Sequence, residues 1–300
     1  IEGRQCPAVS LYLEVNAEDF SIVGVHTAVD RVTVAANLRH SYTRELDRVF
    51  SVGEALPQTP YASELHWMWC FAQALQTARG GVKSNDRPDY SFDVIRSPDG
   101  TERIELTRRS RGTPIDTLVA EMMIHANSHW GRMLDQQGLA GIYRVQSAGK
   151  VRMTTVPGEH QGLGVSHYAW MTSPLRRYAD LVNQWQLAAL LRGQPAPFSK
   201  NDASLLAAVH DFDSSYALYA EFQWRMERYW CLRWLLQEEV KSAHGEVLRE
   251  SLVRFESLPI TTRIPGMPEL AQGTRVLLDI AEIDLLENEL RCTFSAVAPE

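Results

Sequence analysis

Residues 171 to 181 read Met-Thr-Ser-Pro-Leu-Arg-Arg-Tyr-Ala-Asp-Leu. Ser173 is a favourable N-cap residue, and Pro174 suits the first position of a helix. Apolar residues then recur with helical spacing, namely Leu175, Tyr178, Ala179 and Val182. The stretch therefore predicts a helix from Pro174 to about Leu191 with one buried face.

Arg176 and Arg177 fall in the predicted first turn, where the helix dipole favours Asp or Glu. Residues that break a local rule of this kind are frequent at functional sites. A bound anion would resolve the conflict, because backbone N–H groups, the dipole and two guanidinium groups would all point at it. The structural alternative is a capped core helix in which Arg176 pairs with Asp180 on the surface.

Other parts of the chain carry motifs that accompany this stretch. Residues 120–127 read Ala-Glu-Met-Met-Ile-His-Ala-Asn, residues 87–92 read Arg-Pro-Asp-Tyr-Ser-Phe, and residues 142–145 read Ile-Tyr-Arg-Val. Together they resemble the RNase II family, the RNB domain of 3′→5′ exoribonucleases. The family hallmark reads roughly Tyr-x-x-x-Thr-Ser-Pro-Ile-Arg-Arg-Tyr-x-Asp-Leu. The matching positions here are Tyr168, Thr172, Ser173, Pro174, Arg176, Arg177, Tyr178, Asp180 and Leu181, with Leu175 in place of Ile.

The resemblance implies an α+β fold in two domains. Residues 1–240 would form an RNB-type catalytic domain, a mixed sheet with packed long helices, whose N-terminal part is expected to be missing from this sequence. Strand-like alternation begins at residues 8–15 and predicts a meander with strands at 20–26 and 31–36. Turn residues at 97–100 predict a hairpin with strands at 90–96 and 102–107, and apolar spacing predicts a helix over 114–136. Residues 150–164 are expected to be irregular. Residues 241–300 carry short apolar alternations divided by Pro and Gly, which predict a small OB-type β-barrel.

Bulk composition is that of an ordinary globular protein, with 45% hydrophobic and 22% charged residues. The net charge of −7 argues against a generic nucleic-acid coat protein. Residues 130–178 nevertheless hold six bases against two acids, whereas residues 237–300 hold twelve acids against six bases. No apolar run approaches a membrane span. The four cysteines are scattered, so no disulfide partner is expected, and a reducing cytoplasm is the expected location.

The resemblance also implies roles for single residues. Arg176 would bind the reacting phosphate and stabilise charge in the transition state, and Arg177 would do the same or pair with an acid. Glu121 would accept a hydrogen bond from the ribose 2′-hydroxyl, with Tyr42 near the terminal ribose. Core and base-stacking roles are both open for Tyr90 and Phe92. The full set of candidate RNA-binding residues is Tyr42, Tyr90, Phe92, Glu121, Arg144, Tyr168, Thr172, Ser173 and Arg177.

Metal ligands are the main departure from the family pattern. The family holds Mg²⁺ or Mn²⁺ with a cluster of aspartates, and the chain has no matching cluster, since Asp211 and Asp213 follow the signature. The expected ligands would lie upstream of Ile1. Glu121, His125 and His129 are spaced four apart, as metal ligands on a helix can be. Structural or surface histidines are the favoured interpretation, because a fourth ligand with fixed spacing is missing.

Three functions remain open at this level. The first is a 3′→5′ exoribonuclease that degrades single-stranded RNA to nucleoside 5′-monophosphates by metal-dependent hydrolysis, together with the aspartate-bearing upstream part. The second is a non-catalytic RNA-binding protein or fragment of the same fold. The third is an enzyme for a small phosphorylated metabolite, which predicts no dependence on RNA length.

Overall fold

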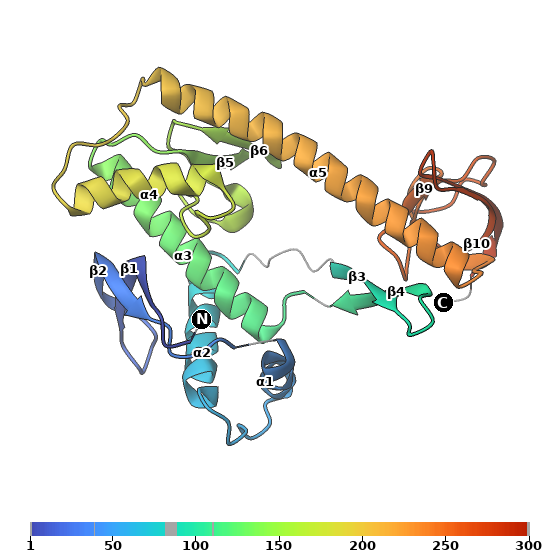
Figure 1. Cartoon of the computed structure of the whole chain (residues 1–300), viewed down its shortest axis with the longest axis horizontal. Helices are drawn as coiled ribbons and strands as arrows, with labels where there is room; N and C mark the ends of the chain where they lie inside the picture. Colours follow the sequence, from blue (N-terminus) through green and yellow to red (C-terminus); the bar gives the residue numbers. More distant parts are fainter. Residues whose placement is uncertain (1, 39, 82–88, 110, 299–300) are drawn as a thin grey trace. The chain divides into compact units, whose positions relative to one another are not determined.

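The computed structural model describes residues 2–38, 40–81, 89–109 and 111–298, without the side chains of residues 40–42. The chain divides into two compact units (Figure 1). The first unit comprises Ile1–Asp86 and Arg111–Ser215, and the second comprises Arg87–Ser110 and Tyr216–Glu300. Among the described helices, none is both long and apolar enough to cross a membrane.

The first unit opens with a long two-stranded antiparallel hairpin of β1 (Gln5–Val15) and β2 (Ile22–Thr33). The predicted three-stranded meander is therefore wrong. Residues 27–30 were expected to separate two strands, but they pair with residues 8–11 and continue β2. They contain neither Gly nor Pro, so nothing in this segment interrupts the ladder. The inner face of the hairpin packs through Val9 and Leu11 on the core.

Four α-helices of the described residues lie wholly within this unit: α1 (His40–Val52), α2 (Ala62–Ala78), α3 (Pro114–Gln136) and α4 (Tyr178–Leu191). Helix α3 has the predicted bounds, with the Thr113 hydroxyl accepting from the Asp116 N–H at its start. Helix α2 ends before Gly80 and Gly81, which both have positive φ. The main core combines α3, α4 and the segment between them, with buried Trp130, Leu134, Tyr143, Ala169, Met171 and Leu187.

A second hairpin, β5 (Tyr143–Ser147) and β6 (Lys150–Thr154), follows α3. Residues 150–164 were expected to be irregular, which is wrong for the first five of them. Ala148 and Gly149 both have positive φ and make a tight turn that returns the chain along β5. The one-turn helix η1 (Gln161–Leu163) comes after the hairpin.

The second unit contains the hairpin β3 (Asp89–Arg96) and β4 (Glu102–Arg109) and a curled five-stranded sheet (Figure 1). The sheet strands are β7 (Ser242–Arg249), β8 (Leu252–Phe255), β9 (Thr261–Arg263), β10 (Arg275–Asp284) and β11 (Glu289–Val297). Their order is β11-β10-β7-β8-β9. Within the described residues the end strands β9 and β11 are not paired with each other, so barrel closure stays a prediction.

Helix α5 (Ala203–Gln237) is continuous and belongs to both units, which divide between Ser215 and Tyr216. Its last turns enter the core of the second unit through Cys231, Leu232 and Leu235. The Gln237 side-chain amide also accepts from the Ile104 N–H at 2.7 Å and donates to the Ile104 carbonyl at 2.9 Å. The unit division thus differs from the predicted boundary at residue 240, because this end of α5 and the β3–β4 hairpin pack with the sheet.

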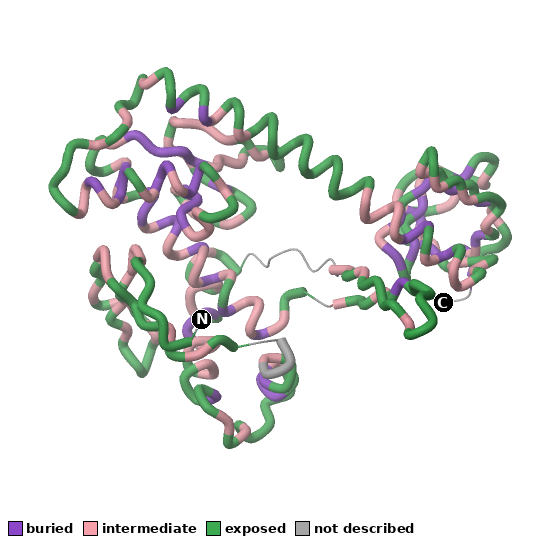
Figure 2. Tube along the Cα trace, viewed as in Figure 1, coloured by how far each residue is buried: buried purple, intermediate pink, exposed green. Residues whose placement is uncertain are grey.

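Buried residues gather in each unit separately. Figure 2 shows them along α3, α4 and the intervening segment of the first unit and along the curled sheet of the second. All four cysteines are free, and Cys231 and Cys292 lie in the core of the second unit. Burial raises the pKa of the Cys231 thiol to about 12, so this thiol stays protonated at neutral pH.

Candidate functional site

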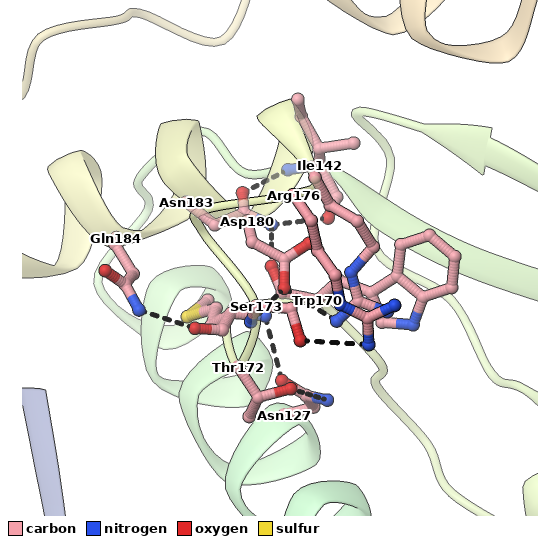
Figure 3. A network of polar contacts seen from close by, with 11 residues as sticks. Asn127, Ile142, Trp170, Thr172, Ser173, Arg176, Asp180, Asn183 and Gln184 are labelled. Atoms are coloured by element: carbon pink, nitrogen blue, oxygen red, sulfur yellow. Dashed lines mark hydrogen bonds and ion pairs between the residues drawn. The ribbon is translucent and has the colours of Figure 1, made fainter. Parts of the chain in front are cut away.

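The segment that leads into α4 is held by side-chain amides from two helices (Figure 3). The Asn127 Oδ1 atom on α3 accepts from the Met171 N–H at 2.9 Å. From α4, Asn183 donates to the Trp170 carbonyl at 3.0 Å and Gln184 donates to the Met171 carbonyl at 2.6 Å. Asn127 and Asn183 are fully buried, so the hydrogen bonds of these two amides are shielded from competition with water. The backbone of Trp170 and Met171 is therefore held by side chains of α3 and α4.

Asn183 extends the same network to the start of β5. Its Oδ1 atom accepts from the Ile142 N–H at 2.7 Å, and its Nδ2 donates to the Ile142 carbonyl at 2.9 Å. The buried face of α4 carries two side-chain amides, Asn183 and Gln186, and such polar residues at helical spacing among apolar ones are the sequence signal for buried hydrogen bonds. No role had been assigned to Asn127, Asn183 or Gln184 from the sequence.

Helix α4 begins at Tyr178, four residues later than predicted. Ser173 is not its N-cap. Residues 174–176 instead form a turn in which the Ser173 carbonyl accepts from the N–H groups of Arg176 and Arg177, at 3.2 and 3.1 Å. Asp180 causes the difference, since its Oδ1 atom accepts from the Ser173 N–H at 2.8 Å and binds the turn from the side. Arg177 is the N-cap residue, with extended φ and ψ of −131° and 115°.

The two arginines of the signature have different surroundings. Arg176 is exposed, and its guanidinium donates to the Ser173 hydroxyl at 3.4 Å. The Arg177 side chain is 13% exposed and pairs at 2.7 Å with Asp180, which is fully buried. The predicted alternative of a surface Arg176–Asp180 pair is therefore wrong. Of the two signature arginines, Arg176 is therefore the one whose guanidinium is accessible to a ligand.

A tryptophan organises further positive charge beside this turn. The Arg177 guanidinium carbon lies 4.1 Å from the centre of the Trp170 ring, and the Arg144 guanidinium carbon lies 4.7 Å from it. Both distances are in the range of cation–π attraction. The formal charges of Arg144, Arg176, Arg177 and Asp180 sum to +2, which is suited to an anionic ligand.

Three other predicted residues are structural parts of this region. Tyr168 is buried, its ring packs edge-on against His160, and its carbonyl accepts from the Arg144 N–H at 2.8 Å. Thr172 accepts from the Asn127 amide at 3.5 Å, the outer limit for a hydrogen bond. Ser173 makes the turn contacts given above. The structure thus brings Arg144, Tyr168, Thr172, Ser173, Arg176 and Arg177 together in the first unit.

Glu121 lies in a buried ion pair with Arg79. Arg79 Nε donates to Glu121 Oε2 at 2.8 Å, Arg79 Nη2 donates to Oε1, and Arg79 Nη1 donates to the Leu163 carbonyl at 2.7 Å. The two side chains are 9% and 3% exposed. Both carboxylate oxygens are engaged, so a contact with a ribose hydroxyl would require this pair to open. Arg79, the last residue before Gly80, had not been singled out from the sequence.

The predicted aromatic contacts have separate outcomes. The side chain of Tyr42 lies outside the described residues. Tyr90 and Phe92 are on β3 of the second unit and share one face of the strand, because they are two residues apart. Both are half-buried, and Phe92 packs against the core of the sheet. Burial also raises the pKa of Tyr90. A packing role accounts for Phe92, and stacking on RNA stays a prediction.

The described residues do not form the metal centre that the resemblance implies. They contain no group of three or more His, Cys, Asp or Glu side chains that could hold an ion, so a two-metal centre does not fit them. The rings of His125 and His129 stack with centroids 6.5 Å apart. Burial lowers the pKa of both, which favours their neutral forms, and Arg132 lowers both further. The location of Mg²⁺ or Mn²⁺ ligands upstream of Ile1 stays a prediction.

Two curated relatives are similar over parts of this chain. An uncharacterised ribonuclease of Synechocystis is 29% identical over 207 residues, covering 58% of this chain and 31% of the relative. Exoribonuclease 2 of Cronobacter sakazakii is 32% identical over 123 residues, covering 40% of this chain and 19% of the relative. The matched part is therefore about a third or less of the length of these relatives.

Solved structures share the fold at low sequence identity. Mycoplasma genitalium RNase R in complex with ribose-methylated single-stranded RNA superposes with a TM-score of 0.76 at 13% identity, over 98% of this chain and 58% of that one. Yeast Ssd1, a pseudonuclease, superposes with a TM-score of 0.63 at 14% identity, over 94% and 42%. The RNB domain family model matches residues 1–155 and 147–193. The chain thus belongs to the RNB domain family, whose relatives include exoribonucleases.

Proposed function

We propose that this chain supplies the phosphate-binding part of an exoribonuclease that degrades single-stranded RNA in the 3′→5′ direction to nucleoside 5′-monophosphates. The observation that carries the proposal is the exposed Arg176, presented on a closed turn in a region of net positive charge. The RNB family membership and relatives named exoribonuclease 2 support it.

Arg176 has the chemistry that phosphate binding requires. A planar guanidinium can donate two parallel hydrogen bonds to the oxygens of one phosphate. In hydrolysis of a phosphodiester such a fork would also stabilise the negative charge that develops on those oxygens. Arg144 adds positive charge beside it, while the amide network keeps the backbone of the site in place. Residues of this chain thereby bind and orient the RNA phosphate.

The divalent ions that the resemblance implies would supply the activated water. We propose that carboxylates outside the described residues hold them, because the described residues offer no fitting group. The curled five-stranded sheet is proposed as an OB-type module, and the four free cysteines agree with a cytoplasmic location.

A second candidate function is RNA binding without hydrolysis. The missing ligand group among the described residues favours it, and the fold is shared with a pseudonuclease. Hydrolysis of a small phosphorylated metabolite is the third candidate. It predicts binding that does not change with RNA length, whereas an RNA-binding site gains affinity until the oligonucleotide fills it.

The experiment that separates the first two functions is a time course on 5′-labelled single-stranded RNA. The 300-residue chain alone is expected to bind the RNA and not to shorten it in millimolar Mg²⁺ or Mn²⁺. Addition of an aspartate-bearing segment of the same protein is expected to restore EDTA-sensitive shortening from the 3′ end. Shortening by the pure chain that EDTA abolishes would contradict the account of the metal ligands given above.

A further inference from the structure

Two neighbouring arginines of the site are held in opposite ways, and one carboxylate causes the difference. Asp180 is fully buried, binds the guanidinium of Arg177 and closes the turn that carries Arg176. We propose that Asp180 is a positioning residue that restricts the phosphate-contacting charge of the signature to Arg176. The inference rests on the proposed function, since it concerns how RNA phosphate is bound.

The first part of the argument concerns the backbone. Both backbone groups of Ser173 are bonded within residues 173–180: its N–H to Asp180 Oδ1, and its carbonyl to the N–H groups of Arg176 and Arg177. The Cα atom of Arg176 therefore sits on a closed loop, and its exposed side chain donates to the Ser173 hydroxyl of the same loop. A fork on a fixed base loses less conformational entropy on binding than one on a mobile loop.

The second part concerns charge. Arg177 Nη2 lies 2.7 Å from Asp180 Oδ1, and one face of its guanidinium is covered by Trp170 at 4.1 Å. Separating a buried pair leaves an uncompensated buried carboxylate, which is strongly unfavourable. Arg177 is therefore retained by Asp180 when RNA is bound. The two side chains together act as a neutral unit beside the anion.

The third part concerns the polar atoms of Asp180 and Arg177 that make no hydrogen bond within the part of the chain that the structure describes. Asp180 Oδ2 and Arg177 Nε are both buried and have no hydrogen-bond partner among the described residues. The pair is thus held by a single oxygen, Oδ1, which also carries the Ser173 N–H. Replacement of Asp180 by Asn would keep this oxygen and remove only the charge, so the two tasks of Asp180 can be separated by mutation.

The test measures how RNA affinity depends on salt, with 5′-labelled oligouridylate and EDTA in every sample. Each neutralised phosphate of a single strand contributes about 0.7 to the slope of log K against log salt. We expect Arg176→Gln to make the slope shallower by about 0.7. Asp180→Asn is expected to make it steeper by up to about 0.7, because Arg177 then carries an uncancelled charge. The charge-neutral double variant Arg177→Gln with Asp180→Asn is expected to keep the slope of the parent chain.

The outcomes separate the two proposals. If Arg176→Gln leaves the slope unchanged, Arg176 is not the phosphate ligand and the proposed function fails with this inference. If Arg176→Gln and the double variant become shallower by the same amount, Arg177 contacts phosphate, and only the role of Asp180 is overturned. A purely structural Asp180 would lower thermal stability in Asp180→Asn without making the slope steeper.

A second measurement on the unmodified chain covers the case in which a variant does not fold. Phenylglyoxal modifies accessible arginines, and peptide mass spectrometry identifies the sites. Arg176 is expected to react and to be protected by RNA, while Arg177 stays unreactive with or without RNA. RNA-dependent protection of a reactive Arg177 would overturn the proposal.

Discussion

Arg79 and Glu121 form a two-pronged ion pair that joins the end of α2 to α3 and is almost closed to solvent. The third donor of Arg79 reaches the carbonyl of Leu163 in η1, so one side chain connects three segments of the first unit. Residues 79 and 121 are 42 positions apart, and the sequence had suggested a ribose contact for Glu121 rather than this pairing.

Glu121→Ala is expected to destabilise the first unit by about 3–5 kcal/mol, because it leaves the buried Arg79 without its anion. The measurement is the free energy of unfolding in urea, followed by circular dichroism. The matched control is Arg79→Met with Glu121→Leu, which replaces the whole pair by apolar groups and should recover much of the loss. A Glu121→Ala chain as stable as the parent would contradict the burial of this pair.

Arg176→Ala is expected to lower turnover by about 10²–10³ in any preparation that hydrolyses RNA, because a transition-state donor is lost. Arg176→Lys should also fail substantially, since a point charge does not reproduce the fork. The melting temperature should stay unchanged, because Arg176 is exposed. Arg192→Ala removes an exposed arginine at the other end of α4 and serves as the control for loss of charge alone. Equal turnover in the parent and Arg176→Ala would remove Arg176 from the site.

Asn183→Ala is expected to destabilise the fold by at least about 1–3 kcal/mol, the cost of leaving a buried polar group unsatisfied. Here the Ile142 N–H and the carbonyls of Ile142 and Trp170 lose their partner together. Asn183→Asp keeps an acceptor for the Ile142 N–H but places a charge beside two carbonyls, so it should be no better. Chemical denaturation measures both, with exposed Gln194→Ala as the control beyond the end of α4.

Stability is expected to fall as the pH drops from about 7.5 to 5.5. Burial lowers the pKa of His125, His129 and His160 below the ordinary value of 6.5, and Arg144 lowers that of His160 further. In this range the unfolded chain binds more protons than the folded chain, so acidification favours unfolding. Stability is therefore retained above the unfolded pKa and lost below it. Melting temperatures across this range provide the measurement.

His160→Phe is the variant that isolates one histidine. Both ring nitrogens of His160 are buried without a partner among the described residues, and its ring packs edge-on against Tyr168. Phe keeps the packing and does not titrate, so the melting temperature should depend less on pH. Carboxylates with a lowered pKa, such as Asp99 and Glu256, contribute stability that the protein loses only at more acid pH. They therefore do not affect the comparison of the parent with His160→Phe between pH 5.5 and 7.5. If the melting temperature of His160→Phe depends on pH as strongly as that of the parent, protonation of His160 does not cause the loss of stability.

Local signals in the sequence were sufficient for several elements. Helix α3 has its predicted bounds because Thr113, Pro114 and the following apolar spacing all favour the same helix. The β3–β4 hairpin formed where Ser97-Pro98-Asp99-Gly100 provides turn chemistry, although the strands extend one or two residues further than predicted. In these places local preference and tertiary packing agree, so no distant residue is needed to explain them.

The site itself depended on contacts that a linear pattern does not contain. The start of α4 was displaced to Tyr178, because Asp180 accepts from the Ser173 N–H seven residues earlier and residues 173–177 form a separate turn. Trp170 brings Arg144 and Arg177 to one ring from positions 33 residues apart in the chain. Spacing along a helix could indicate that Arg176 and Arg177 were unusual, but not which of them would be buried.

The bond between Ile104 and Gln237 has a consequence for the making of the protein. Ile104, on the β3–β4 hairpin, leaves the ribosome 133 residues before Gln237 at the end of α5 does. At about 5–20 residues per second, that interval lasts roughly 7–27 seconds. During this time the N–H and C=O groups of Ile104 and the apolar faces of Phe92 and Leu106 have none of their native cover from α5 and the curled sheet. The nascent chain thus passes through a period in which a finished hairpin is open to pairing with other chains, and rapid release or a chaperone on that hairpin would raise the yield of folded protein.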